Sequence, residues 1–449
     1  MTHQSGSMVR SLIDSPKRPH TGVASSTVNV IRGLSIAIAL LVVACGGEPS
    51  VEVVQTVMPS PLPSPVVPVI VVPTATPEPT VPGSTPTAEP TATPVPLGSW
   101  DVLSPLKHAR SDHFAVRLVD GRVLVGGGFG PDGIMATTET YSPADDSWAE
   151  AGELIIARTG GVAALLQDGR VLVTGGNSGG DANDLDSAEI FDPLTGVWKL
   201  IAPMASKRNI HTATTLGDGR VLVAGGFDGA DYPDLVTDNV QLFYPATDSW
   251  ESAEPMPADF LQNDGGRAIH GAVLLSDTQV MIVGGLGFGS GGLPDLASSL
   301  IFDSETGEWT VADSLLNGRR GHATTLLTDG RVVVTGGQGP MPFAEVWDPE
   351  EDVWDGSGVN LTPRLGHSAV ALPDGGILIF GGSGSGRRNQ LVSAEFLRSG
   401  ADTWEEAAEM STARTGVTVT PLEDGRFLVI GGNGDSGALD LVEAFSTNE

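Results

Sequence analysis

The strongest constraint on this chain is a pair of glycines that returns seven times, each time after a short apolar run. An Asp-Gly pair precedes six of the seven runs, and Asp-Gly between two strand-like segments is a strong signal for a β-hairpin. The glycine pairs end at Gly128, Gly176, Gly226, Gly285, Gly337, Gly382 and Gly432. Repetition of this kind predicts several copies of one small structural unit rather than one irregular core.

Each repeat has a second half with its own pattern. A loop of variable length follows the glycines, and then a segment such as AEIFDPLTGVW (188–198) predicts a strand, a tight turn and another strand. Each repeat therefore predicts four antiparallel strands, which suits one blade of a β-propeller. The tryptophans that close the repeats are 45 to 59 residues apart, at Trp148, Trp198, Trp250, Trp309, Trp354 and Trp404.

The order R-x-x-H, then D-G-R-V-L-V-x-G-G, then A-E-x-[FY]-D-P-x-T-x-x-W resembles kelch repeats of the galactose-oxidase type over residues 100–449. This resemblance implies an all-β fold, a seven-bladed β-propeller of four-stranded antiparallel blades. The last repeat ends without its fourth strand, whereas Trp100 precedes Arg110 by the same ten residues seen within the array. We therefore expect a domain over 98–449 in which an N-terminal strand at Trp100 completes the last blade and closes the ring.

The residues before the repeats predict export and anchoring. Basic residues precede an apolar stretch, Leu34 to Ala44, which is too short to span a bilayer and fits a signal-peptide core. It resembles a bacterial lipoprotein signal over 1–45, and this implies a lipidated Cys45; a plain secretory signal with an incidental cysteine is the alternative. The start could be Met1 or Met8. Residues 46–97 are rich in proline and threonine, and we expect a disordered stalk that holds the domain on the order of 100 Å from the lipid.

Charge and cysteine content limit the possible partners. Residues 99–449 contain 50 acidic and 20 basic side chains, a net charge of −30, which disfavours binding to nucleic acid or to anionic lipid headgroups. With one cysteine no disulfide forms within the chain. We expect a monomer that touches the membrane only through its lipid anchor, with the propeller on the extracellular or periplasmic side.

Strand parity predicts which face carries the variable loops. With strands a to d numbered outward from the channel, the b-to-c loops and d-to-a connections lie on one face, and the tight turns lie on the other. The d-to-a step is ten residues in six cases and seventeen from Trp250 to Arg267, and the longest b-to-c loop, 286–299, belongs to the same fourth repeat. Long loops on a rigid scaffold commonly bind ligands, so this loop-rich face is where we expect a protein or glycan partner.

An arginine opens every repeat, and two interpretations are open. Seven guanidinium groups could ring the channel mouth and bind a carboxylate, sulfate or uronate through bidentate hydrogen bonds. Alternatively, each arginine pairs with a repeated acid such as Glu139, Glu189, Glu345, Glu395 or Glu443, and strict repetition favours this structural role. The candidate ligand-binding residues are Arg110, Arg158, Arg208, Arg267, Arg319, Arg364 and Arg414.

Other polar groups point more weakly to a site. A histidine lies three residues after five of the arginines, at His113, His211, His270, His322 and His367, and we expect these side chains to be structural rather than metal ligands. Acidic loop runs at 181–186 and 228–231 could hold calcium, but neither fits the EF-hand pattern, and solvated loop charge is the favoured interpretation. We therefore expect neither a metal nor a cofactor.

Catalysis has little support in the sequence. Galactose oxidase uses copper and a tyrosine crosslinked to a cysteine, and the cysteine of this chain lies before the stalk. No G-x-S-x-G elbow, P-loop or H-E-x-x-H motif is present. Our leading hypothesis is a non-catalytic, surface-displayed binding module. The alternative is an isomerase, mutarotase or lyase acting on an acidic sugar at the channel mouth, and the sequence does not identify a ligand for either.

Overall fold

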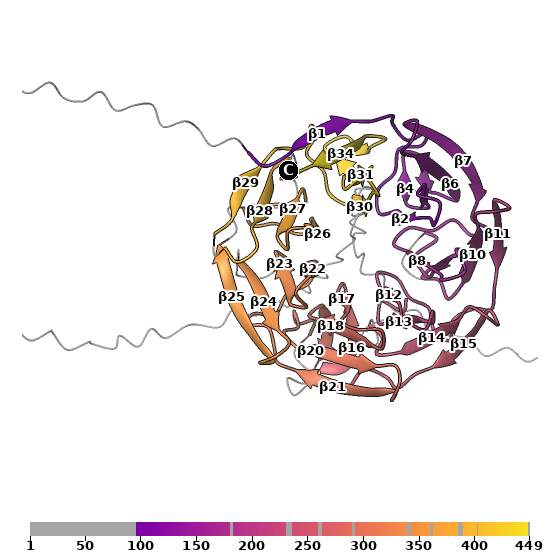
Figure 1. Ribbon diagram of the computed structural model, residues 1–449. Coiled ribbons are helices and arrows are strands. Elements are labelled where there is room, and N and C mark those ends of the chain that lie inside the picture. The colour runs from indigo at the N-terminus through magenta and orange to yellow at the C-terminus, as the bar shows by residue number, and fades with distance from the viewer. Residues whose placement is uncertain are drawn as a thin grey trace, which may run out of the picture.

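A computed structural model describes residues 96–447 except for 180–182, 230–235, 259–262, 290–291, 339–342, 360–361, 385–388 and 402. The predicted signal sequence, Cys45 and nearly all of the predicted stalk lie outside the described residues. The described part of the chain is built from strands without helices, so it contains no helix able to cross a membrane. The described residues form seven four-stranded sheets, or blades. Figure 1 shows these blades arranged around a central axis.

The first four blades are consecutive four-stranded antiparallel meanders. Blade one consists of β2 (Phe114–Arg117), β3 (Val123–Gly126), β6 (Thr137–Ser142) and β7 (Ser147–Glu153). Blade two consists of β8 (Val162–Leu165), β9 (Val171–Thr174), β10 (Ala188–Asp192) and β11 (Val197–Leu200). Blade three consists of β12 (Thr212–Thr215), β13 (Val221–Ala224), β14 (Val240–Tyr244) and β15 (Ser249–Ser252). Blade four consists of β17 (Gly271–Leu274), β18 (Gln279–Val283), β20 (Ser299–Asp303) and β21 (Glu308–Ala312).

The remaining blades keep this order until the last one. Blade five consists of β22 (Ala323–Leu326), β23 (Val332–Thr335), β24 (Phe343–Asp348) and β25 (Val353–Val359). Blade six consists of β26 (Ser368–Ala371), β27 (Ile377–Phe380), β28 (Ala394–Leu397) and β29 (Glu405–Ala407). Blade seven consists of β30 (Thr418–Pro421), β31 (Phe427–Ile430), β34 (Val442–Ser446) and, from the start of the domain, β1 (Ser99–Val102).

The predicted closure of the ring is confirmed. β1 pairs antiparallel with β34, with Ser99 opposite Ser446 and Trp100 opposite Phe445. The Trp100 indole donates a hydrogen bond of 2.7 Å to the Ala408 carbonyl and packs edge-on against Phe380 and Phe445, with ring centroids 5.6 and 5.1 Å away. The two ends of the described chain are thus joined in one sheet, as Figure 1 shows, and no blade is left with three strands.

The hydrophobic core is divided among the contacts between blades. The second strand of each blade is an apolar run, and in six blades it is buried along its whole length, for example β9 and β23. β18 of blade four begins instead with the half-buried Gln279. Side chains of neighbouring blades interlock in seven buried clusters, and the clusters together cover every blade-to-blade contact, including that between blades seven and one. Burial of apolar surface therefore stabilises the closed ring as a whole.

The repeated glycine pairs have a conformational reason. Both members of each pair have positive φ, 55 to 63° for the first glycine and 86 to 106° for the second. A Cβ on Gly176 would lie 2.7 Å from the Thr159 carbonyl oxygen, so glycine alone fits this close approach. The N–H of the second glycine donates to the carbonyl of the repeat arginine in the next blade at 2.8 to 3.0 Å in all seven blades. These turns join each blade to its neighbour.

Candidate functional site

The loop-rich face carries extra structure where the sequence predicts insertions. β16 (Asn263–Ala268), from the long connection into blade four, pairs with β19 (Leu286–Gly289) of that blade's b-to-c loop. Two smaller ribbons stand on blades one and seven, formed by β4 (Phe129–Gly130) with β5 (Gly133–Ile134) and by β32 (Asn433–Gly434) with β33 (Gly437–Ala438). The two insertions of blade four thus form one structural unit.

A buried cation anchors this ribbon to the neighbouring blade. Arg320 of blade five donates to Oδ1 of Asp295, in the blade-four loop, at 2.5 Å and to Oε1 of Gln338 at 2.8 Å. Burial raises the pKa of Asp295, and the nearby guanidinium opposes this effect. The inserted loop is therefore held by a partly buried ion pair rather than by backbone contacts alone.

The seven repeat arginines are buried, with at most 2 % of each residue exposed. Five of them form ion pairs with the repeated glutamate of their own blade, in the pairs Arg110–Glu139, Arg158–Glu189, Arg319–Glu345, Arg364–Glu395 and Arg414–Glu443. Each arginine also donates from Nη1 to the carbonyl of the first glycine of its own pair. In these five blades the arginine, the glutamate and the glycine turn form one network.

In blades three and four the arginine contacts serine, asparagine or glutamine side chains at this position. Arg208 donates to Oδ1 of Asn239 at 2.6 Å and to the Ser206 hydroxyl at 2.9 Å, and Arg267 donates to the Ser298 hydroxyl at 3.1 Å. Burial lowers the pKa of Arg208 to about 10. The geometry at all seven positions supports the structural interpretation, and ligand binding by these guanidinium groups stays a prediction that requires the network to open.

Four of the five repeat histidines, His113, His211, His270 and His367, connect neighbouring blades. Nε2 of His211 lies 2.7 Å from the hydroxyl of Thr174 in blade two, and Nε2 of His113 lies 2.8 Å from the hydroxyl of Thr418 in blade seven. Burial lowers the pKa of His113, His270 and His322 to about 3, so these imidazoles are neutral at pH 7. Among the residues that the structure describes, no group of three or more His, Cys, Asp or Glu side chains is placed to hold a metal ion.

The two acidic loops named in the sequence lie side by side. Asp184, in the loop of blade two, is 6 % exposed and accepts a hydrogen bond of 2.8 Å from the Asn177 amide. A Cβ on Gly229, in the loop of blade three, would lie 3.5 Å from a carboxylate oxygen of Asp184. Burial raises the pKa of Asp184, and the charge of Asp228 adds to the shift. Residues 181, 182, 230 and 231 of these runs lie outside the described residues.

Sequence reasoning missed a ring of backbone at the channel mouth, formed by the residues two positions after each repeat arginine. These seven residues all have φ between 51 and 64°, and six N–H groups donate around the ring to the carbonyl of the preceding blade at 3.0 to 3.4 Å. Ile210 and Ile269 hold this conformation although β-branched residues rarely adopt it. The residues of this mouth ring are Asp112, Gly160, Ile210, Ile269, Gly321, Gly366 and Gly416. Its one sequence signal is the glycine that occupies this position in four of the seven repeats.

Comparison with known proteins agrees with this architecture. Residues 158–205 and 210–257, which are blades two and three, match the Kelch motif. These segments are kelch repeats. The kelch resemblance and the seven-bladed all-β fold predicted from the sequence are confirmed. The comparison with curated proteins gave no match.

Two solved structures share the fold at low sequence identity. A fungal alcohol oxidase of the AA5 family, in complex with copper, aligns with a TM-score of 0.61 and 17% identity, covering 78% of this chain and 76% of that one. YjhT aligns with a TM-score of 0.52 and 15% identity, covering 68% of this chain and 99% of that one. At this identity the likeness concerns the fold alone.

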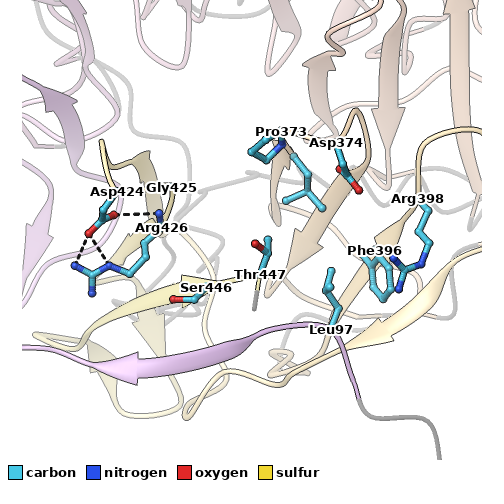
Figure 2. A pocket seen from close by; sticks show the side chains of 11 residues that line it. Leu97, Pro373, Asp374, Phe396, Arg398, Asp424, Gly425, Arg426, Ser446 and Thr447 are labelled. Carbon is cyan, nitrogen blue, oxygen red and sulfur yellow. Dashed lines mark hydrogen bonds and ion pairs between the residues drawn. The ribbon is translucent and has the colours of Figure 1, made fainter. Parts of the chain in front are cut away.

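A cavity of about 450 Å³ lies on the opposite face, between the tight turns of blades six and seven. Figure 2 shows Asp374 and Arg398 on one side, the Asp424–Arg426 pair on the other, and Leu97 and Thr447 near the two ends of the described chain. Sequence reasoning did not predict this cavity.

Proposed function

We propose that this protein is a surface-displayed, non-catalytic binding module. In this proposal a lipidated Cys45 anchors the chain, residues 46–97 act as the stalk, and the propeller stands on the extracellular or periplasmic side as a monomer. The partner is a protein or glycan that binds the loop-rich face.

The observation that carries the proposal is the direction of β1. This strand pairs with β34 as an outer strand, so Leu97 and Ser446 lie at the end of blade seven that also carries the tight Asp424–Arg426 turn. The d-to-a connections and b-to-c loops, including the ribbon of β16 and β19, lie at the other end of the blades. A stalk that enters at Leu97 would therefore hold the propeller from its tight-turn face and leave the loop-rich face directed away from the anchor.

Exposed apolar side chains on the loop-rich face support binding there. Phe129 in the blade-one loop is 40% exposed, and Leu293 in the blade-four loop is 38% exposed. Exposed aromatic and aliphatic side chains are common anchors in protein interfaces. The buried arginines weaken the enzymatic alternative, because an acidic sugar at the channel mouth would no longer meet seven open guanidinium groups.

The test begins with a glycan array and a cell-surface pull-down using the full-length protein. The variants Phe129→Ser and Leu293→Ser are then compared with Leu194→Ser, whose side chain is 96% exposed in a c-to-d turn on the opposite face. We expect the first two variants to weaken binding of the recovered ligand about tenfold, and Leu194→Ser to leave it unchanged. Equal binding by all three would refute the assignment of the face, and turnover of an acidic sugar would favour the enzymatic alternative.

A further inference from the structure

The Asp-Gly turn of blade six lacks the arginine that its counterparts have. In the other five Asp-Gly turns the next residue is an arginine that pairs with the turn aspartate at 2.6 to 2.8 Å. Blade six reads Asp374-Gly375-Gly376 instead. Oδ1 of Asp374 accepts the N–H of Gly376 at 2.9 Å, and no ion pair joins Asp374 to a described residue. This aspartate is therefore an acceptor whose usual guanidinium partner has been removed.

The arginine of this turn can also extend to the next blade. Arg170 of blade two donates to Oδ1 of Asp248 at 2.9 Å and to the Pro245 carbonyl at 2.7 Å, and both acceptors lie in the c-to-d turn of blade three. Arg220 of blade three likewise donates to the Ser304 carbonyl of blade four at 3.0 Å. In these blades an arginine side chain occupies the space between two neighbouring turns on the tight-turn face.

The cavity lies at the corresponding place between blades six and seven, beside Ser446 and Thr447, where the third strand of blade seven ends and the other blades have their c-to-d turn. Its walls are the blade-six turn with Asp374, the blade-seven turn, and the paired ends of blade seven at Leu97, Ser446 and Thr447. Figure 2 shows Asp374 at the edge of this space, apart from the Asp424–Arg426 pair across it. The loss of one arginine thus coincides with an open space of about 450 Å³.

The lining of the cavity favours a cation on an aliphatic stem. Leu372 and Phe396 are 4 and 2% exposed and provide apolar surface. The two lining cations already have partners: Arg426 pairs with Asp424 at 2.8 Å, and Arg398 pairs with Glu405 at 3.3 Å and lies 4.8 Å from the Phe396 ring. Asp374 is exposed and adds a carboxylate without such a partner. A planar guanidinium matches a carboxylate through two hydrogen bonds.

We propose that this cavity is a binding site for a guanidinium group, supplied either by a small alkylguanidine or by an arginine side chain of a partner. The ligand restores in trans the contact that Arg170 and Arg220 make within the chain. This site lies on the face opposite the proposed partner surface and does not depend on it.

The experiment is calorimetric titration of the full-length protein with agmatine and, separately, with N-acetyl-arginine amide. Binding of agmatine alone indicates that the site takes a small alkylguanidine. Binding of both probes indicates that an arginine side chain also fits. Either result supports the site only if Asp374→Asn weakens the affinity for the probe at least tenfold. The matched control is Asp168→Asn, because Asp168 already has Arg170 as its partner. This control should bind like the wild type.

A second variant supplies the cation within the chain. Gly376→Arg restores the repeat sequence, and we expect it to abolish binding of both probes. A Cβ at this position would lie 2.7 Å from the Leu397 carbonyl oxygen, so the turn must shift to accept the side chain, and a cooperative melt of the variant is required before binding is measured. The comparison of the wild type with Asp374→Asn does not require this variant. The site can therefore be tested even if the Gly376→Arg protein fails to fold. The proposal is overturned if neither probe binds at millimolar concentration, if Asp374→Asn binds as well as the wild type, or if N-acetyl-glutamate binds in their place.

Discussion

The buried pair of Arg110 and Glu139 gives the sharpest test of the network within the blades. Both side chains are fully buried, and Nη2 of Arg110 lies 2.8 Å from Oε1 of Glu139. Glu139 also accepts the backbone N–H groups of Lys107 at 2.8 Å and His108 at 3.2 Å, which belong to the connection entering blade one. Replacement of Glu139 by alanine therefore leaves one buried guanidinium and two N–H groups without this acceptor.

The expected cost follows from these contacts. Removal of one partner of a buried ion pair costs about 3 to 5 kcal/mol, and each buried donor left without an acceptor costs about 1 to 3 kcal/mol, but neighbouring terms do not add fully. We expect Glu139→Ala to lower the free energy of unfolding by about 5 kcal/mol. Glu139→Gln should cost only about 2 kcal/mol, because blade three already combines Arg208 with Gln241, whose Oε1 accepts the N–H of Ala205 at 2.9 Å.

The assay is urea unfolding followed by tryptophan fluorescence, with the change in midpoint and slope measured for each variant. Glu153→Ala, at an exposed position of β7, is the matched control and should lie within about 0.5 kcal/mol of the wild type. If the free energy of unfolding of Glu139→Ala is less than about 1 kcal/mol below that of the wild type, the buried guanidinium has found another acceptor and the prediction is wrong.

Two further predictions concern pH and ring closure. His113, His270 and His322 have folded pKa values near 3, well below the ordinary value of 6.5, so the unfolded state takes up protons first as the pH falls. These groups therefore do not affect stability above pH 6.5, and stability is lost between pH 6.5 and 3 at up to about 1.4 kcal/mol per pH unit for each histidine. In thermal melts from pH 7 to 4, the melting temperature of His270→Gln should fall less steeply with pH than that of the wild type. An equal slope for the two proteins would contradict this prediction. Trp100→Ala should lower the free energy of unfolding by about 3 kcal/mol and speed proteolysis where β1 pairs with β34, because the indole packs on Phe445 and hydrogen-bonds the Ala408 carbonyl. Resistance to proteolysis equal to that of the wild type would show that other contacts hold β1 in place.

Much of the fold was predictable because each repeat contains its own turn and strand signals. The glycine pairs mark the ends of the second strands, and the ten-residue step from Trp100 to Arg110 identified the strand that completes blade seven. Periodicity is less informative about side-chain direction. The same repeated arginine was compatible with an open cationic ring or with a buried network, and the structure shows all seven side chains buried.

The features that sequence reasoning missed depend on contacts between distant residues. Isoleucine is disfavoured at positive φ, so Ile210 and Ile269 gave no sign of the mouth ring. The sequence has Gly376 where the other five Asp-Gly turns have arginine. That this substitution leaves a space between two blades becomes evident only from the contact of Arg170 with Asp248, 78 residues further along the chain. The neutral partners of Arg208 were likewise not predicted. Gln241 takes the place of the repeated glutamate, and Asn239, two residues earlier, supplies an additional acceptor.

The most direct test of binding by the loop-rich face is to block each face of the propeller in turn. Single cysteines introduced at Leu293 on the loop-rich face and at Leu194 on the tight-turn face are coupled to a maleimide polymer, with the wild type treated identically to account for any reaction at Cys45. Binding of the ligand recovered in the screen is then measured for each conjugate. If the loop-rich face binds the partner, polymer at position 293 abolishes binding and polymer at position 194 leaves it intact. The opposite result, or equal binding by both conjugates, would show that the partner binds elsewhere.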